Sequence, residues 1–304
     1  MQIIEILFGL LVYPGLIFAF LTGSMLYWLY RKVRARFQAR KGPPWYQVFA
    51  DVIKLLSKET IIPSTAGKIF FLMAPLLAIT GCLVSIVLLP MGSQYPTASF
   101  TGDLIVILYL LTLPGLALII AGMNSGSPYG TIGATREASL MIAYELPFAL
   151  SALTVGIYAG TLSVASIVQA QLSRGAFVSH YPLATIAFIL CMLPKMGKRP
   201  FDIPEAEYEI IAGSLTEYSG VLLGLFEMAN AIKWFVIPGF AVVLFFGGST
   251  NIVEFLGKCI GVTLILAFID ILYPRFRIDQ GFKFFLKIAL PIAIIDFVRV
   301  LLGW

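Results

Sequence analysis

Acidic residues inside otherwise apolar sequence are the part of this chain best suited to chemistry. Of its 304 residues, 16 are Asp or Glu, and several of these fall within runs of about 20 apolar residues. A carboxylate surrounded by hydrocarbon costs several kcal/mol, so such residues usually line a cavity, pair with a cation or carry a proton. We therefore take them as candidates for moving protons or other cations.

Glu137 and Glu145 belong to one such run, residues 136–160. On a helix, eight residues separate two side chains by about 80° around the axis and ~12 Å along it, so both can line one polar path. Tyr144 follows Glu137 by seven residues and falls on the same helix face. Arg136 and Glu137 could equally mark a helix end at the membrane interface, whereas the deeper position of Glu145 favours a functional role.

The segment of residues 198–220 is the richest in carboxylates, and four of them fall within eight residues: Asp202, Glu205, Glu207 and Glu209. Like charges this close repel one another, so burial would raise some of their pKa values and let them exchange protons near neutral pH. An ordinary solvated acidic loop is the alternative, although the apolar residues around the segment argue against full solvation.

Two more carboxylates follow. Glu217 lies at the end of the same segment, and Glu227 begins a polar stripe that Asn230 and Lys233 continue at steps of three residues. On a helix this spacing gives a slanted row of polar groups within an apolar run.

Membrane helices must position these residues. The hydrophobic share of the chain is 59% and the charged share 12%, about half of the ~25% usual in soluble proteins. We expect a single all-α, polytopic membrane domain over residues 1–304. Its eight transmembrane helices are predicted at residues 3–30, 69–91, 103–123, 136–160, 181–197, 221–247, 252–272 and 284–303.

The distribution of Lys and Arg predicts the orientation. If the N-terminus is outside, 17 of the 21 Lys and Arg residues lie in cytoplasmic segments. The sequence therefore predicts a multi-pass protein of the cell membrane with both termini extracytoplasmic. The net charge of +5 then reflects loops that face anionic lipid headgroups, and it does not indicate a nucleic-acid partner.

A cytoplasmic helix in the membrane plane is predicted after the first span, at about residues 43–58. Val48, Val52 and Leu56 recur at helical spacing, while Asp51 and Lys54 fall mostly on the other side. This pattern is typical of an amphipathic interfacial helix. It could be a simple surface anchor, or it could form the rim of a lateral cavity or a docking shelf.

Several chemistries find no support in the sequence. The three cysteines are far apart, and neither a metal-ligand spacing nor a nucleotide-binding glycine motif is present. His180, the single histidine, has no second ligand near it in sequence. We therefore expect neither a metal nor a cofactor in this chain. Asp296 and Arg299, three residues apart near the end of the last run, are expected to form an interfacial ion pair.

Three ordered motifs resemble the H-type membrane subunit of respiratory complex I and cover nearly the whole chain. They are Arg40-Lys41-Gly42-Pro43 with Ala50-Asp51 and Lys54-Leu55; Gly133-Ala134-Thr135-Arg136 with Ala143-Tyr144-Glu145; and Pro200-Phe201-Asp202-Ile203-Pro204-Glu205-Ala206-Glu207 with Thr216-Glu217-Tyr218-Ser219-Gly220.

The resemblance implies a membrane protein that joins a peripheral redox arm to a membrane arm that pumps protons or sodium ions. It implies a coupling pathway that includes Arg136, Glu145, Asp202, Glu205, Glu207 and Glu217. From their own positions in the sequence we add Glu137, Tyr144, Glu209 and Glu227 to this pathway. It further implies a contact with the peripheral arm through Arg40, Lys41, Asp51, Lys54, Lys195, Lys198 and Arg199.

Departures from the complex I pattern fall where a quinone would bind. Lys195 stands where complex I has a glutamate, and Asn230 stands in place of another, with Glu227 one turn earlier. The Gly197-Lys198-Arg199 sequence is more similar to the energy-converting membrane-bound [NiFe] hydrogenases and the related archaeal sulfur-reducing complexes.

That similarity implies a ferredoxin-linked oxidoreductase complex whose redox centres lie in partner chains. The expected partners are hydrogenase-like large and small subunits, a ferredoxin-like iron–sulfur subunit and antiporter-like membrane subunits. Iron–sulfur clusters and a NiFe centre would belong to them. A sulfane-sulfur reductase, an NADH:quinone oxidoreductase, a stand-alone ion carrier and a purely structural anchor are the alternatives.

Overall fold

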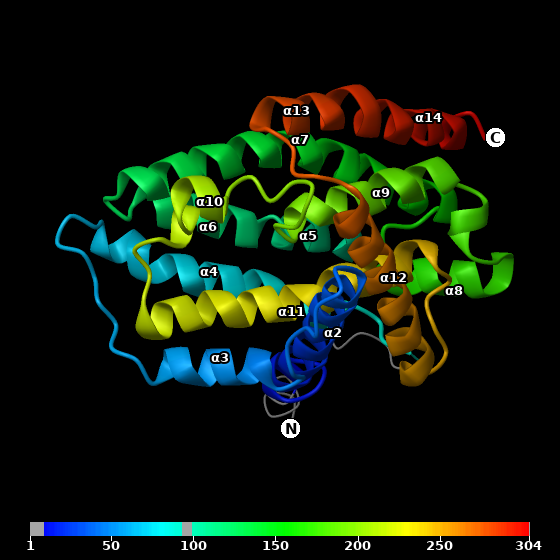
Figure 1. The fold of residues 1–304 in the computed structure, drawn as a ribbon. Coiled ribbons are helices and arrows are strands. Elements are labelled where there is room, and N and C mark those ends of the chain that lie inside the picture. Colours follow the sequence, from blue (N-terminus) through cyan, green and yellow to red (C-terminus); the bar gives the residue numbers. More distant parts are fainter. Residues whose placement is uncertain (1–8, 93–98, 304) are drawn as a thin grey trace.

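The computed structural model describes residues 9–92 and 99–303, apart from the side chains of Glu207 and Tyr208 (Figure 1). Regular structure in this part of the chain is helical. The longer helices are α2 (Leu16–Phe37), α3 (Gln47–Leu56), α4 (Lys68–Val87), α5 (Asp103–Leu110), α6 (Leu113–Met123), α7 (Pro128–Ala159), α8 (Val164–Arg174), α9 (Pro182–Lys195), α11 (Gly220–Phe245), α12 (Ile252–Leu272), α13 (Ile278–Phe284) and α14 (Leu290–Leu301). Short elements are η1 (Phe177–Ser179), α10 (Glu207–Ile210), η2 (Gly213–Leu215) and a π-helical turn (Phe285–Ala289).

The prediction of a polytopic helical membrane protein is confirmed. Within the described residues, six helices are long and apolar enough to cross a membrane: Gly9–Phe37, Lys68–Val87, Asp103–Met123, Pro128–Ala159, Gly220–Phe245 and Ile252–Leu272. The predicted fifth span corresponds to α9, whose 14 residues reach about 21 Å, less than a hydrocarbon core of ~30 Å. The predicted eighth span is built from α13, the π-helical turn and α14, which follow one another without a break.

Helix α7 begins eight residues earlier than the sequence predicts. Its first turn starts at Pro128, a residue that suits the first helical position because its missing N–H would be unpaired there anyway. Gly133 and Ala134 are buried, and Gly133 approaches the backbone of Gly213 in η2 so closely that a Cβ would lie 2.8 Å from the Gly213 Cα. The first turns of α7 therefore pack against protein rather than lipid, which is why they need not be apolar.

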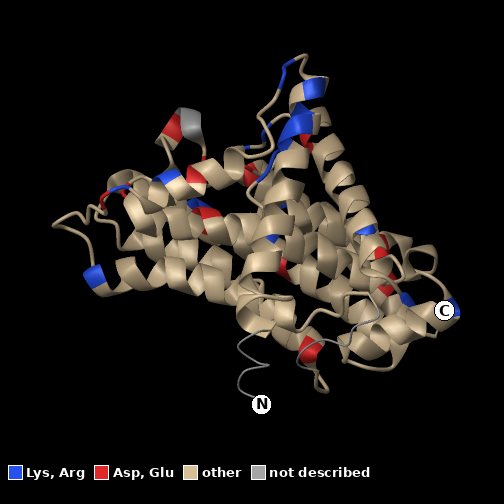
Figure 2. Ribbon diagram, turned by 90° about the horizontal axis from the view of Figure 1, so that it is seen from below, with Lys and Arg blue, Asp and Glu red and all other residues tan. Residues whose placement is uncertain are grey.

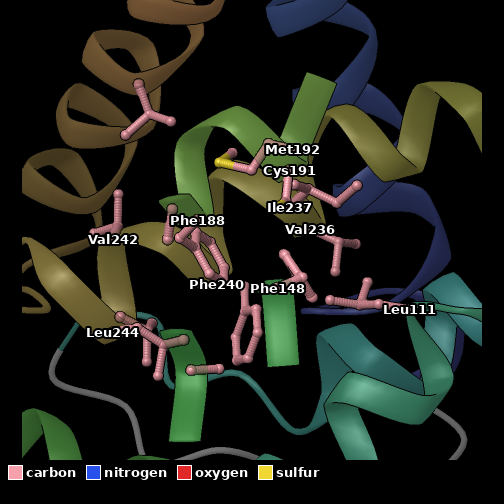
Figure 3. Close-up of a cluster of buried hydrophobic side chains, with 14 of the residues drawn as sticks. Leu111, Phe148, Phe188, Cys191, Met192, Val236, Ile237, Phe240, Val242 and Leu244 are labelled. Atoms are coloured by element: carbon pink, nitrogen blue, oxygen red, sulfur yellow. The ribbon is translucent and has the colours of Figure 1, made fainter. Parts of the chain in front are cut away.

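Helix α11 forms the centre of the bundle, where it packs on α2, α4 and α12, while α7 packs on α6, α9 and α14. Figure 3 shows the core between these groups, where Phe148 of α7, Phe188 of α9 and Phe240 of α11 meet. The Phe148 and Phe188 rings stack with centroids 4.5 Å apart. Because lipid is as apolar as these side chains, close packing rather than escape from water holds such helices together.

Two amphipathic helices lie beside this bundle. The predicted one is α3, which buries Val48 and Val52 against α11 and α2. The other, α8, falls in a stretch where the sequence predicts a loop. Its Gln171 donates to the Val243 carbonyl at 2.6 Å and accepts from the Gly247 amide at 2.7 Å, so α8 caps the C-terminal end of α11.

The segments predicted to share one membrane side do meet at one end of the bundle, which we call the acidic-loop end. Arg34, near the end of α2, lies 3.0 Å from Asp270 of α12. The amide of Phe276 donates to the Pro200 carbonyl at 2.9 Å. Figure 2 shows the body of the bundle largely free of charge, with a basic group at one edge and a few charges inside. That this end faces the cytoplasm stays a prediction.

Candidate functional site

A buried ion pair joins α7 to the last turn of α9. The Lys195 ammonium lies 2.5 Å from a Glu145 carboxylate oxygen and donates to the Leu111 carbonyl at 3.2 Å. That carbonyl is available because the helix is interrupted between α5 and α6. The ammonium also lies 4.5 Å from the centre of the Phe148 ring. Carboxylate, carbonyl and ring together compensate the loss of water around the charge.

Lys195 differs from its expected place. The resemblance put it at the contact with the peripheral arm, yet it is only 6% exposed and its charge is paired with Glu145. It therefore belongs with the interior acidic residues rather than with the surface. The sequence gives one signal for this: the lysine closes an apolar run that is too short to carry it to the membrane surface.

Glu137 and Tyr144 lie on one face of α7, as the spacing predicts. Glu137 is 5% exposed, and the Tyr144 hydroxyl shares a hydrogen bond with its carboxylate. Helix α6 approaches this pair at Gly115, where a Cβ would lie 3.2 Å from Glu137 Oε1 and 3.6 Å from the Tyr144 hydroxyl. A glycine at this position leaves room for both polar groups.

A small, partly polar cavity of about 40 Å³ lies between α4, α6, α11 and the acidic loop. The polar stripe of α11 lines it with Glu227, Asn230 and Lys233, and the acidic loop contributes Glu205. Lys233 and Glu205 are the two charges that act most strongly on Glu137. One water needs about 10–15 Å³ of such volume, so the cavity has room for about three waters. It brings the acidic loop and the polar stripe of α11 together.

Asp202 is the acidic-loop residue with the most unusual surroundings. Its Oδ1 is buried and has no hydrogen-bond partner among the described residues. Burial, and then the charge of Glu205, raise the pKa of the Asp202 carboxyl to about 6. Its charge therefore changes just below neutral pH, as the crowding of carboxylates predicts.

Glu209 behaves in the opposite way at the outer edge of the same loop. Its carboxylate lies 2.6 Å from Arg136 of α7 and 3.6 Å from Arg275. The hydrogen bond from Arg136 lowers the pKa of Glu209. All three line a pocket of about 470 Å³ at the surface. The structure thus places Arg136 and Glu209 together, but outside the interior group. The side chain of Glu207 lies outside the described residues.

The two remaining candidates for the coupling pathway, Glu227 and Glu217, lie in different surroundings. Glu227 lines the small cavity and also a second pocket of about 420 Å³ between α2, α3 and α11, which Arg31 and Asp51 share. Glu217 is half-buried and is not among the residues that line the small cavity. Its neighbour Tyr218 stacks on Phe71 with ring centroids 3.9 Å apart and fixes the segment to α4.

The residues expected to meet the peripheral arm lie mostly at the surface. Arg40, Lys41 and Lys54 are exposed, and Asp51 accepts from Gln47 at 2.9 Å and lies 3.7 Å from Lys54. Lys198 and Arg199 are half-buried beside the acidic loop, and the Lys198 ammonium lies 5.3 Å from the centre of the Tyr27 ring. Arg40, Lys41 and Lys54, unlike Lys195, are accessible to a partner chain.

No three His, Cys, Asp or Glu side chains within the described residues gather as metal ligands would. The expectation that partner chains carry the redox centres stays a prediction. Lys233 is an interior charge that was not among the predicted pathway residues. The sequence does show it within the polar stripe of α11.

Comparisons with known proteins agree over almost the full chain. A family model described as NADH dehydrogenase matches residues 10–301. The H-type subunit of the NADH-quinone oxidoreductase of Salinibacter ruber is 31% identical over 93% of this chain and 92% of its own length. Its counterpart in Dehalococcoides mccartyi strain CBDB1 is 34% identical over 95% and 85%. A chain from the structure of the membrane-bound sulfane sulfur reductase, an archaeal respiratory membrane complex, superposes with a TM-score of 0.88 at 31% identity, covering 98% of this chain and 99% of that one.

Proposed function

Because this chain belongs to the NADH dehydrogenase family, which contains the H-type subunits of complex I, and is thus a membrane component of a complex I-like oxidoreductase, we propose that it couples electron transfer in a peripheral arm to the movement of protons or sodium ions. The observation that carries the proposal is the buried Lys195–Glu145 pair. A fixed charge pair inside a membrane helix bundle is costly, so it is expected where ion movement depends on it.

The coupling begins at the acidic loop. A change of charge in the peripheral arm near Asp202 and Glu205 shifts the protonation of Asp202, whose pKa of about 6 makes its charge easy to change. Glu205 lines the small cavity with Lys233, and both act on Glu137. Glu137 responds to Glu145 as well, so a charge change at the loop alters the balance of the Lys195–Glu145 pair. The pair passes the change to ions in adjoining membrane subunits.

The electron donor in this proposal is a ferredoxin, and no quinone is needed. Lys195 fills the place of a complex I glutamate and holds Glu145. The partners are then hydrogenase-like large and small subunits, an iron–sulfur subunit and antiporter-like subunits.

Two acceptors fit this arrangement. The first is proton reduction at a partner's NiFe centre, which the Gly197-Lys198-Arg199 sequence supports. Reduction of sulfane sulfur is the second, and the similarity to the sulfane sulfur reductase chain favours it. Isolation of the complex and mass spectrometry of its chains separates them. A large subunit with two Cys-x-x-Cys pairs and hydrogen evolution supports the first, whereas incomplete pairs and sulfide formation support the second.

The coupling role itself is tested by Glu145→Gln, with Glu254→Gln as a matched control. Glu254 also pairs with a lysine, Lys258, at 2.7 Å, but at the surface of α12. In inverted membrane vesicles driven by reduced ferredoxin, the Glu145→Gln complex should assemble and reduce its acceptor, while ion uptake falls at least tenfold. The control should keep both activities. Unchanged ion uptake in Glu145→Gln would refute the proposal.

A further inference from the structure

Three residues that can carry positive charge gather at the end of the bundle opposite the acidic loop. Arg174 closes α8, His180 precedes α9 and Arg299 lies near the end of α14. They come from separate segments, yet each lies against one of two neighbouring tyrosine rings. The Arg174 guanidinium is 5.7 Å from the Tyr158 centroid, and the His180 ring is 5.6 Å from it.

Arg299 completes the group. Its guanidinium lies 5.7 Å from the centre of the Tyr181 ring, and the Tyr181 and Tyr158 rings have centroids 4.9 Å apart. Tyr158, His180, Tyr181 and Arg299 line a pocket of about 430 Å³ together with Ile157, Val300 and Gly303. We call it the tyrosine pocket. Its volume lies within the range of ordinary small-molecule sites.

The described acidic residues do not use all the hydrogen-bond donors of the cations at this pocket. Asp296 faces Arg299 at 2.8 Å, as the sequence predicts, and its other oxygen accepts from the Ala184 amide at 2.8 Å. Asp296 is fully buried, so it fixes one edge of the Arg299 guanidinium. A guanidinium has five N–H donors, and the side chain remains 42% exposed. Donors on Arg299 and His180 are therefore available to an outside anion.

The surroundings of the pocket suit an amphiphile. Tyrosine is enriched at the level of lipid headgroups, where an apolar ring and a polar hydroxyl are both accommodated. Exposed apolar side chains continue from the pocket along α7 and α14: Ile157, Val298, Leu301 and Leu302. A ligand with an anionic head and apolar tails would contact both parts. An acidic side chain of a partner protein would use the cations but not the apolar surface.

We propose that the tyrosine pocket binds the phosphate of an anionic phospholipid, with Arg299 and His180 donating to the phosphate oxygens and Arg174 adding positive charge behind Tyr158. Arg–phosphate contacts are among the strong, charge-assisted hydrogen bonds. Most Lys and Arg residues are predicted to lie on the cytoplasmic side. A lipid site would explain why Arg174 and Arg299 lie on the opposite side. It is independent of the proposed coupling role.

The test uses the intact complex, purified in mild detergent and exchanged free of native lipid. Native mass spectrometry measures retention of phosphatidylglycerol, with phosphatidylcholine of the same chains for comparison. The variants are Arg174→Gln and His180→Ala, which leave the Arg299–Asp296 pair intact. Lys287→Gln, which removes an exposed cation elsewhere, is the matched control. We expect one tightly retained phosphatidylglycerol, an affinity at least fivefold weaker in the double variant, and no change in the control.

Inorganic phosphate separates the two sources of the anion. If millimolar phosphate displaces no phosphatidylglycerol, the tails contribute as proposed. If phosphate displaces it fully, the pocket is a free-phosphate site and the lipid assignment fails. Equal retention of both lipids, equal retention by the double variant, or a partner chain that covers the pocket in the intact complex would each overturn the proposal.

Discussion

The two ion pairs that α7 forms with neighbouring segments place similar charges in different surroundings. Glu145 meets Lys195 of α9, and the side chains are 21% and 2% exposed. Arg136 meets Glu209 of α10, and the side chains are 24% and 53% exposed. The first pair lies among helices and an aromatic ring, whereas the second borders an open pocket.

The difference in exposure decides how easily the two charges of each pair can be separated. Where water is excluded, separating two charges costs far more than it does in water. The Lys195–Glu145 pair is therefore stable as a unit and sensitive to any third charge nearby. The Arg136–Glu209 pair is screened by solvent and opens at small cost. In the proposed coupling role, the inner pair is the one that responds to a change of charge at the acidic loop.

Breaking the inner pair should have the largest effect. Lys195→Met leaves the Glu145 carboxylate without its cation in a nearly dry environment, which should destabilise the protein by about 3–5 kcal/mol. The measurement is the Tm of the complex in detergent. Removing both charges with Lys195→Met/Glu145→Gln should restore most of the loss, because no unpaired charge remains.

Lys283→Met is the matched control, since Lys283 is exposed on α13, and it should leave the Tm unchanged. If the double variant is no more stable than Lys195→Met alone, the lysine acts through its packing on Phe148 and not as the counter-charge of Glu145.

Asp202→Asn should have an intermediate effect that depends on pH. The pKa of Asp202 in the folded protein is about 6, above its ordinary value of 3.8. Stability from the neutral carboxyl is therefore fully present below about pH 4 and is lost as the pH rises through about 6. The variant stays neutral, so its Tm should fall less than that of the wild type between pH 4 and pH 7.

Glu209→Gln is the control for this pH effect, because the pKa of Glu209 is lowered rather than raised. It should keep the wild-type loss of Tm between pH 4 and pH 7. An equal loss in the Asp202→Asn variant would show that Asp202 does not titrate in this window.

The sequence predicts the apolar helices well because a membrane demands long runs of one kind of residue. It fails at α7, where the first turns pack on α6 and η2 and so carry polar residues. It also fails at α8, which is too polar to resemble a span and too short to resemble an independent helix. In both cases the helix packs against protein instead of lipid, and amino-acid composition does not distinguish these two environments.

The candidate site is predicted in part for a similar reason. Spacing along one helix places Glu137 beneath Tyr144, because a single helix fixes both. The Lys195–Glu145 contact joins residues 50 positions apart, and no local pattern can join them. Asp202 and Glu209 lie in one loop and look alike in sequence, yet their pKa values shift in opposite directions. Burial and the approach of Arg136 decide the difference, and both depend on tertiary structure.

Breaking the outer pair should have the smallest effect and completes the comparison. Arg136→Gln removes one partner of a half-exposed pair, so stability should fall by only about 0.2–1 kcal/mol. Glu209 also lies 3.6 Å from Arg275, which partly replaces the lost charge. Raising the salt concentration should remove the difference in Tm between wild type and variant, because solvent ions screen exposed charges, whereas the effect of Lys195→Met should persist in the same salt. A loss as large as that of Lys195→Met would mean that Arg136 acts inside the bundle, and the division into an inner and an outer pair would fail.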